Sequence, residues 1–180
     1  MTKILIVAIL SALLMDTTRR TYIAMLSLVA LWCGMVVAAP LLGSVSETTA
    51  SAVYKFFSRI CHQLEERSFH IAGGQFAVCI RCSAIYFAFF LGVMVYGAVR
   101  GLANRSTPPL YLLSVASFPM LVDVLLNITG IHASTNATRL VTGSLFGFAL
   151  PWYVLPVLFE SLSGISRPSK GEPFYARKAE

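Results

Sequence analysis

Three cysteines and one histidine stand close together in the longest polar part of this chain. Cys61 and His62 are adjacent, and Cys79 and Cys82 are separated by one isoleucine and one arginine. Two cysteines at this spacing can both bind one tetrahedral ion, or they can form a disulfide. We expect Cys82 near the start of a helix, where exposed backbone N–H groups and the helix dipole favour a thiolate. The spacing therefore predicts either a metal site or a thiol–disulfide pair.

A full set of four ligands forms if Cys61 and His62 join this pair. Three cysteines and one histidine are a common structural site for zinc or a similar divalent ion, and such a closed set leaves no open position for catalysis. Neighbouring residues on a helix project about 100° apart, so Cys61 and His62 share one ion only if the helix ends there. If the helix continues, His62 is an exposed polar residue or hydrogen-bonds to a ligand. We predict a metal site formed by Cys61, His62, Cys79 and Cys82.

The same cysteines also support a redox interpretation. In a membrane thiol–disulfide oxidoreductase, Cys79 and Cys82 would be the exchanging pair, and Cys61 would be the resolving thiol. The chain contains no P-loop, dinucleotide-binding fingerprint, nucleophile elbow or His-Glu-x-x-His motif. These absences leave the cysteines as the main candidates for chemistry.

One carboxylate, Asp123, lies inside an apolar stretch. A charge in such a place costs about 2.5–3.5 kcal/mol on insertion scales, so it is normally paired or functional. Arg139 begins the next apolar stretch at the same end, and we predict that Asp123 and Arg139 form a buried ion pair beneath the metal site. His132 and Asn136 lie in the short connection between them, and His132 is read as a solvated loop residue.

The elements that position these residues are four predicted membrane-spanning helices. Hydrophobic residues make up 57% of the 180 residues and charged residues only 12%, whereas typical globular chains carry about a quarter charged residues. Each apolar stretch falls within the range of about 17–25 residues that a membrane-spanning helix takes. Pro151 and Pro156 should kink the last stretch, and Cys33 is a small apolar side chain in the first. The sequence predicts an all-α membrane bundle with spans over residues 22–43, 83–99, 109–128 and 140–162.

The other segments are assigned from their polarity and periodicity. Residues 44–82 form the Cys/His loop, in which apolar residues at helical spacing predict an amphipathic helix from Ala50 to Leu64, either on the bilayer surface or packed on the bundle. Ser46 is a suitable helix start, and Gly73 with Gly74 allows a tight return before Cys79. Residues 1–21 read as a leader or an extension that does not span, and residues 164–180 as a polar disordered tail.

The distribution of Lys and Arg predicts the orientation and the partners. More of them flank the spans on the side of the two termini, which predicts a multi-pass protein of the cell (plasma) membrane with both termini in the cytoplasm and the Cys/His loop outside. The net charge of +6 comes from residues that stand singly or in pairs, so we expect contact with the lipid bilayer and no nucleic-acid binding. Gly143 and Gly147 give the last span a close-packing face. Packing within the bundle is the default, and the alternatives are a homo-oligomer or an accessory subunit of a larger membrane complex.

Three strings of residues resemble a known family. They are residues 59–69 (RICHQLEERSF), 79–86 (CIRCSAIY) and 136–143 (NATRLVTG), and together with Asp123 they resemble the prokaryotic membrane proteins of domain-of-unknown-function family 2085. The resemblance covers about residues 55 to 150. The chain departs from the family pattern at Glu65, where a proline is usual, and at Ser83-Ala84, where Thr-Gly is common. The resemblance implies a polytopic membrane protein and supplies no activity. The matching residues are Cys61, His62, Gln63, Arg67, Ser68, Phe69, Cys79, Arg81, Cys82, Tyr86, Asp123, Arg139, Thr142 and Gly143.

Overall fold

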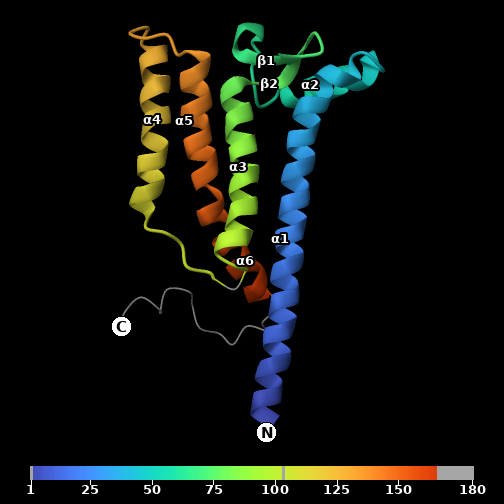
Figure 1. Ribbon diagram of the computed structural model, residues 1–180, viewed down its shortest axis with the longest axis vertical. Coiled ribbons are helices and arrows are strands. Elements are labelled where there is room, and N and C mark those ends of the chain that lie inside the picture. Colours follow the sequence, from blue (N-terminus) through green and yellow to red (C-terminus); the bar gives the residue numbers. More distant parts are fainter. Residues whose placement is uncertain (1, 103, 166–180) are drawn as a thin grey trace.

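The computed structural model describes residues 2–102 and 104–165, which are mostly helical (Figure 1). Within these described ranges, four helices are long and apolar enough to cross a membrane, over Thr17–Leu42, Ile80–Val99, Leu110–Ile128 and Asn136–Leu162. The prediction of an all-α bundle of four membrane-spanning helices is therefore confirmed. The helices of the bundle are α1 (Thr2–Leu42), α3 (Ile80–Val99), α4 (Leu110–Ile128), α5 (Asn136–Ala149) and α6 (Pro151–Ile165).

The first helix is longer than the predicted span. Helix α1 has 41 residues and rises about 60 Å, twice the thickness of a hydrocarbon core of about 30 Å. The segment predicted as a leader or extension, residues 1–21, continues into the span without a break from Thr2 onward. The predicted tail, residues 164–180, lies outside the described residues except for its first two, which end α6.

Helix α3 is the centre of the bundle. It packs most extensively against α5, and α1 contacts its other side (Figure 1). Helix α4 packs mainly against α5 and is the least buried of the four spans. Gly143 and Gly147 of α5 face α3: a Cβ at Gly143 would lie 2.8 Å from the carbonyl oxygen of Arg81, and one at Gly147 would overlap the backbone of Ile85. The predicted close-packing face is therefore used inside the chain and is not free for another subunit.

The fourth span is two helices instead of one. Helix α5 ends at Ala149, and α6 begins at Pro151 and turns toward α1 (Figure 1). Proline lacks an N–H and its ring clashes with the preceding helical turn, which explains the break at this position. The second proline, Pro156, lies inside α6, so only the first of the two interrupts the span.

An apolar cluster closes the end of the bundle at which α6 lies. Its fully buried members come from α3 and α6, and Trp152 packs edge-on against Tyr96 with ring centroids 5.5 Å apart. Aromatic pairs in this arrangement add to the free energy gained from apolar burial. The buried side chains of this cluster are Val93, Tyr96, Leu155 and Phe159.

The other end of the bundle, which we call the cysteine end, carries a small folded segment. It consists of α2 (Glu47–Phe57), a short 3-10 helix (Glu65–Arg67) and an antiparallel hairpin of β1 (Ser68–Ile71) and β2 (Gly74–Cys79). The predicted helix from Ala50 to Leu64 exists but is shifted, because Ser46 caps its start and the chain leaves the helix after Phe57. Phe57 is fully buried against Trp32, with ring centroids 5.2 Å apart, so α2 packs on the bundle. The hairpin was not predicted, apart from its turn.

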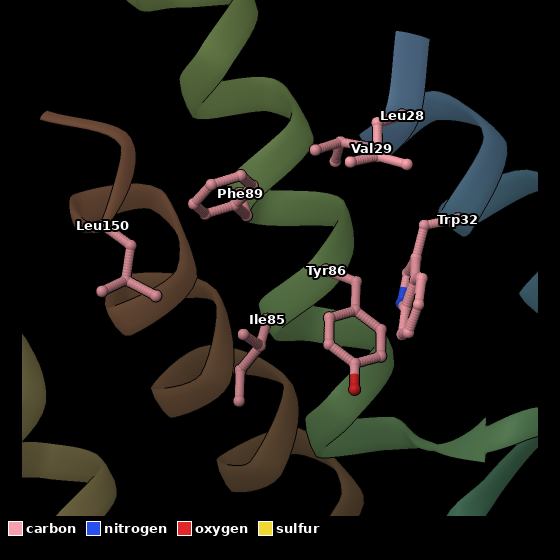
Figure 2. A pocket seen from close by; sticks show the side chains of 7 residues that line it. All are labelled: Leu28, Val29, Trp32, Ile85, Tyr86, Phe89 and Leu150. Carbon is pink, nitrogen blue, oxygen red and sulfur yellow. The ribbon is translucent and has the colours of Figure 1, made fainter. Parts of the chain in front are cut away.

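A pocket of about 280 Å³ opens between α1 and α3 (Figure 2). Tyr86 and Trp32 meet there edge-on, with ring centroids 5.7 Å apart. All the lining side chains are apolar or aromatic, so the pocket suits hydrocarbon better than a polar ligand. They are Leu28, Val29, Trp32, Ile85, Tyr86, Phe89 and Leu150.

The contact between α3 and α5 can be tested at Gly147. We expect Gly147→Leu to lower the melting temperature of the purified protein in detergent, because overpacking a tight contact costs about 1–3 kcal/mol or more. Gly34→Leu in α1 is the matched control, since a Cβ at Gly34 meets nothing within 4 Å. Equal melting temperatures for the two variants would contradict the close packing.

Candidate metal centre

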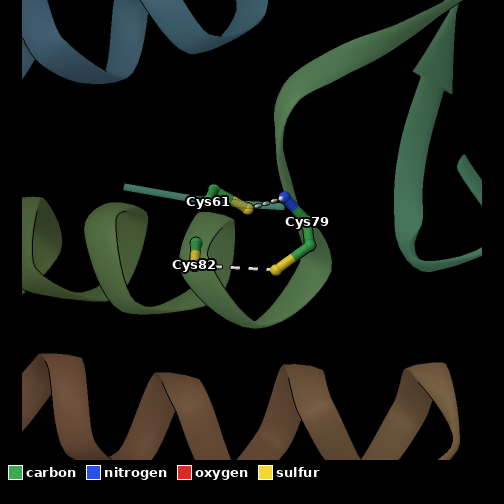
Figure 3. A group of neighbouring side chains, drawn as sticks. All are labelled: Cys61, Cys79 and Cys82. Atoms are coloured by element: carbon green, nitrogen blue, oxygen red, sulfur yellow. Dashed lines mark hydrogen bonds between the residues drawn. The ribbon is translucent and has the colours of Figure 1, made fainter. Parts of the chain in front are cut away.

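Three elements each bring one cysteine to the cysteine end. Cys61 follows α2, Cys79 is the last residue of β2, and Cys82 lies in the first turn of α3. Their three sulfur atoms all lie within 4.8 Å of one another (Figure 3). The structure thus brings together the three predicted sulfur ligands, although Cys61 is 18 residues from Cys79.

The side chain of Gln63 positions Cys61 beside the hairpin. Gln63 has a φ of 52°, a left-handed conformation that turns the chain sharply. Its amide nitrogen donates hydrogen bonds to the carbonyl oxygens of Tyr54, at 2.9 Å, and Ala77, at 2.7 Å. One side chain therefore ties α2 to β2 across the segment that carries Cys61. In the sequence, Gln63 stands out only as part of a motif, and nothing there indicates this role.

Apolar packing excludes water from part of this site. Cys61 is only 6% exposed, and it belongs to a cluster of buried residues from α1, α2 and β2. Because side chains in such a cluster are closely packed, the sulfur of Cys61 has little freedom to move away from its neighbours. The other buried members of this cluster are Val36, Ala39, Phe57, Ala77 and Val78.

The sulfur positions suit a tetrahedral ion. Zinc–sulfur bonds of about 2.3 Å place two thiolates on one tetrahedral ion about 3.8 Å apart. The sulfur atoms of Cys79 and Cys82 are 3.6 Å apart, and both cysteines are free thiols. Only small shifts would bring all three sulfurs to the distances of a common ion, and the same proximity would also allow thiol–disulfide exchange.

Hydrogen bonds favour the thiolate form of Cys61. Its sulfur accepts a hydrogen bond from the backbone N–H of Cys79 at 3.1 Å. Hydrogen bonds from the side chains of Cys79 and Cys82 hold the pKa of the Cys61 thiol well below its ordinary value, and they outweigh the opposing effect of burial. The thiolate is the form of cysteine that binds metal. The surroundings of Cys61 therefore favour the form of the thiol that could bind a metal ion.

His62 lies beside the sulfur cluster but outside it. Among the described residues, the group whose donor atoms lie within 4.8 Å of one another contains the three cysteines and not His62. His62 is exposed and lines the same pocket as the cysteines. The helix has ended before this point, which is the condition under which Cys61 and His62 could share an ion.

Asp123 lies at the cysteine end and contacts Arg81. Its side chain is 6% exposed, and its carboxylate accepts a hydrogen bond from the Nη2 of Arg81 in the first turn of α3. Ser134 supports the pair, because its hydroxyl donates to the carbonyl oxygen of Asp123 at 3.2 Å and accepts from Arg81 at 3.5 Å. The pair joins α4 to α3. Asp123 lies at the end where it was predicted, but its ion-pair partner is Arg81 and not the predicted Arg139.

The position of Arg81 follows from its place in the helix. Arg81 and Cys82 are adjacent in the first turn of α3, so their side chains project about 100° apart. Cys82 therefore faces the other sulfurs while Arg81 faces α4 and α5. Gly143 lies against this turn, since a Cβ there would lie 2.8 Å from the carbonyl oxygen of Arg81 and 3.0 Å from the Cβ of Ala84. The sequence alone does not indicate which of the two arginines faces Asp123.

Arg139, the predicted partner of Asp123, is buried without an acidic contact in the described part of the chain. Its Nη1 donates a long hydrogen bond of 3.5 Å to the side-chain oxygen of Asn136 in the same turn of α5. It lines the pocket beside the three cysteines, close to Arg81. His132, read as a solvated loop residue, is exposed.

The importance of the Arg81–Asp123 pair can be measured by a double-mutant cycle. Removing one partner of a buried ion pair costs about 3–5 kcal/mol, so Asp123→Asn and Arg81→Gln should each lower the melting temperature. The double variant should be more stable than the sum of the two losses predicts, because neither charge is then left alone. Glu66→Gln, at an exposed acid, is the control. Strictly additive losses would show that the pair is not coupled.

Comparisons with known proteins agree with the membrane fold. A family model described as "Predicted membrane protein (DUF2085)" matches residues 61–153, which is more than half of the chain and contains all three clustered cysteines. The chain is 37% identical over 110 residues to the uncharacterized protein MJ1492 of Methanocaldococcus jannaschii, covering 61% of this chain and 70% of that protein. It is 33% identical over 94 residues to an uncharacterized protein of Methanothermobacter thermautotrophicus, covering 52% of this chain and 83% of that protein. No solved structure matches the chain. The chain therefore belongs to the DUF2085 family of predicted membrane proteins.

Proposed function

We propose that this membrane protein binds a divalent metal ion, most simply zinc, through Cys61, Cys79 and Cys82. One observation carries the proposal: three sulfur atoms from three separate elements lie within 4.8 Å of one another. Thiolates prefer zinc and other soft or borderline ions to magnesium or calcium. Cys79 and Cys82 alone could serve a disulfide equally well, but the convergence of a third sulfur favours a shared ion.

The proposed role of the ion is structural. The three cysteines belong to the segment after α2, the end of β2 and the start of α3, so one ion would fix the small folded segment to the bundle. Metal binding to such a site contributes directly to the free energy of folding. We propose His62 as the fourth ligand, because it is adjacent to Cys61, exposed and lines the same pocket as the three cysteines.

Metal analysis of the purified protein tests this proposal. We expect stoichiometric zinc or a similar ion in the unaltered protein and in Cys33→Ala, the matched control, whose cysteine is buried in α1 and does not belong to the group of three sulfurs. Cys61→Ala, Cys79→Ala and Cys82→Ala should each lose most of the metal, because two sulfurs cannot complete the site. His62→Ala should keep the metal but release it to a chelator more readily, with an affinity lower by roughly tenfold or more.

The redox alternative makes the opposite prediction. A membrane thiol–disulfide oxidoreductase would be isolated without metal, with a disulfide between Cys79 and Cys82 that exchanges with small thiols. Labelling free thiols before and after reduction distinguishes the two states. A metal-free protein with this disulfide would overturn the metal proposal and support the oxidoreductase.

We propose that the cysteine end lies outside the cytoplasm of a prokaryotic cell, with both termini inside. The support is the excess of Lys and Arg flanking the spans on the side of the termini, which marks the cytoplasmic side. We expect a peptide tag at the C-terminus to be accessible to antibody only after the cells are permeabilised, whereas a tag inserted at the hairpin turn between β1 and β2 should be accessible in intact cells. The reverse pattern would refute this orientation.

A further inference from the structure

A pocket of about 340 Å³ lies against the three cysteines, and three arginines line it. Arg67 comes from the short 3-10 helix, Arg81 from the first turn of α3 and Arg139 from the first turn of α5. Three elements that are distant in sequence thus each contribute one arginine to the lining of this cavity. A metal site would explain why the cysteines line this pocket. It would not explain the arginines, because a divalent ion is bound by thiolates and imidazoles and not by cationic side chains.

Arg139 is the clearest sign that a ligand is needed. It is only 7% exposed, yet among the described residues no carboxylate lies within ion-pair distance of it. Among the described residues, its guanidinium group makes a single hydrogen bond, a long one of 3.5 Å to the Asn136 side chain. A buried charge is costly unless it is paired and hydrogen-bonded. An anion in the pocket would supply the missing partner.

Arg81 gives an independent sign. Its Nη2 contacts Asp123, but its Nε is buried and has no hydrogen-bond partner among the residues that the structure describes. Buried polar groups in proteins are nearly always hydrogen-bonded. Since Arg81 lines the same pocket as Arg139, one ligand could contact both arginines.

The backbone and the balance of charge also favour an anion. Helices α3 and α5 both begin at this pocket, and the N-terminus of a helix carries exposed N–H groups and a partial positive charge. Three thiolates with a divalent ion would leave one negative charge, and Asp123 adds a second. The three arginines therefore still leave a positive surplus at the pocket.

We propose that this pocket binds the phosphate group of a ligand through Arg139, Arg81 and Arg67, an activity beyond the proposed metal binding. Arginine forks match phosphate oxygens in pairs, and donors from three directions suit a tetrahedral oxyanion. The pocket volume of about 340 Å³ is many times the roughly 30 Å³ that one water molecule occupies in the liquid. The pocket therefore has room for a ligand larger than a bare phosphate ion. Free phosphate and the headgroup of a phospholipid share this chemistry, and the pocket lies at the end of a membrane bundle, where both are within reach.

Binding to the full-length, delipidated protein in detergent tests the proposal. Inorganic phosphate is titrated by calorimetry, and phosphatidylglycerol is added and followed by native mass spectrometry. We expect at least one of the two to bind, and its affinity to fall at least tenfold in Arg139→Gln and in Arg67→Gln, the second variant guarding against a folding defect in the first. Arg59→Gln is the matched control, since Arg59 is exposed at the same end but does not line the pocket.

The two probes and one further variant separate the outcomes. Binding of phosphate assigns a soluble ligand, and binding of phosphatidylglycerol alone assigns a lipid. Binding of neither, or equal binding by Arg139→Gln, Arg67→Gln and Arg59→Gln, overturns the proposal. The titrations are repeated on Cys79→Ala: retained anion binding by this variant shows that the pocket acts without the metal. If the unaltered protein holds no metal and still binds the anion, the proposed metal function fails and this inference stands.

Discussion

The first turn of α3 is the constraint on which the cysteine end depends. Strand β2 passes into this helix at Cys79 and Ile80 without a linker, so the hairpin and the helix are joined rigidly. Within one turn, Arg81 contacts Asp123 of α4 and Cys82 approaches the other sulfurs. A shift of this turn would therefore disturb both the helix packing and the sulfur cluster. The proposed metal ion and the observed ion pair act on adjacent residues of the same backbone.

More of the fold than of the candidate site could be predicted from the sequence. Long apolar stretches are visible in the sequence because crossing a membrane requires them, and the four spans were identified on that basis. The break at Pro151 followed from the chemistry of proline, whereas the end of α2 at Phe57 depended on tertiary packing that a single sequence does not show. The hairpin was missed because its strands are short and sit in a polar loop. The role of Gln63 was not visible either, because its two hydrogen-bond acceptors are backbone atoms that only the folded structure brings near it.

The site residues were found by type but not always paired correctly. Cys61, Cys79 and Cys82 were grouped because they share one polar loop and because Cys79 and Cys82 have the spacing of metal ligands, and the structure places their sulfurs together. Asp123 was placed at this end from its depth in the span. The choice between the two arginines required knowing which side chain of the neighbouring helices faces Asp123, which a single sequence does not show.

The two ends of the bundle are held by interactions of different chemical kinds. At one end, Tyr96 and Phe159 belong to a cluster of buried apolar side chains. At the other, three cysteine sulfurs lie close to the Arg81–Asp123 ion pair. Thiol-directed oxidants, and chelators if the proposed metal is bound, would act on this sulfur group and not on the buried members of the apolar cluster, which include no cysteine. The helical bundle could therefore persist while the small folded segment of α2 and the hairpin loosens. This would make that segment responsive to the redox state and metal supply of its surroundings.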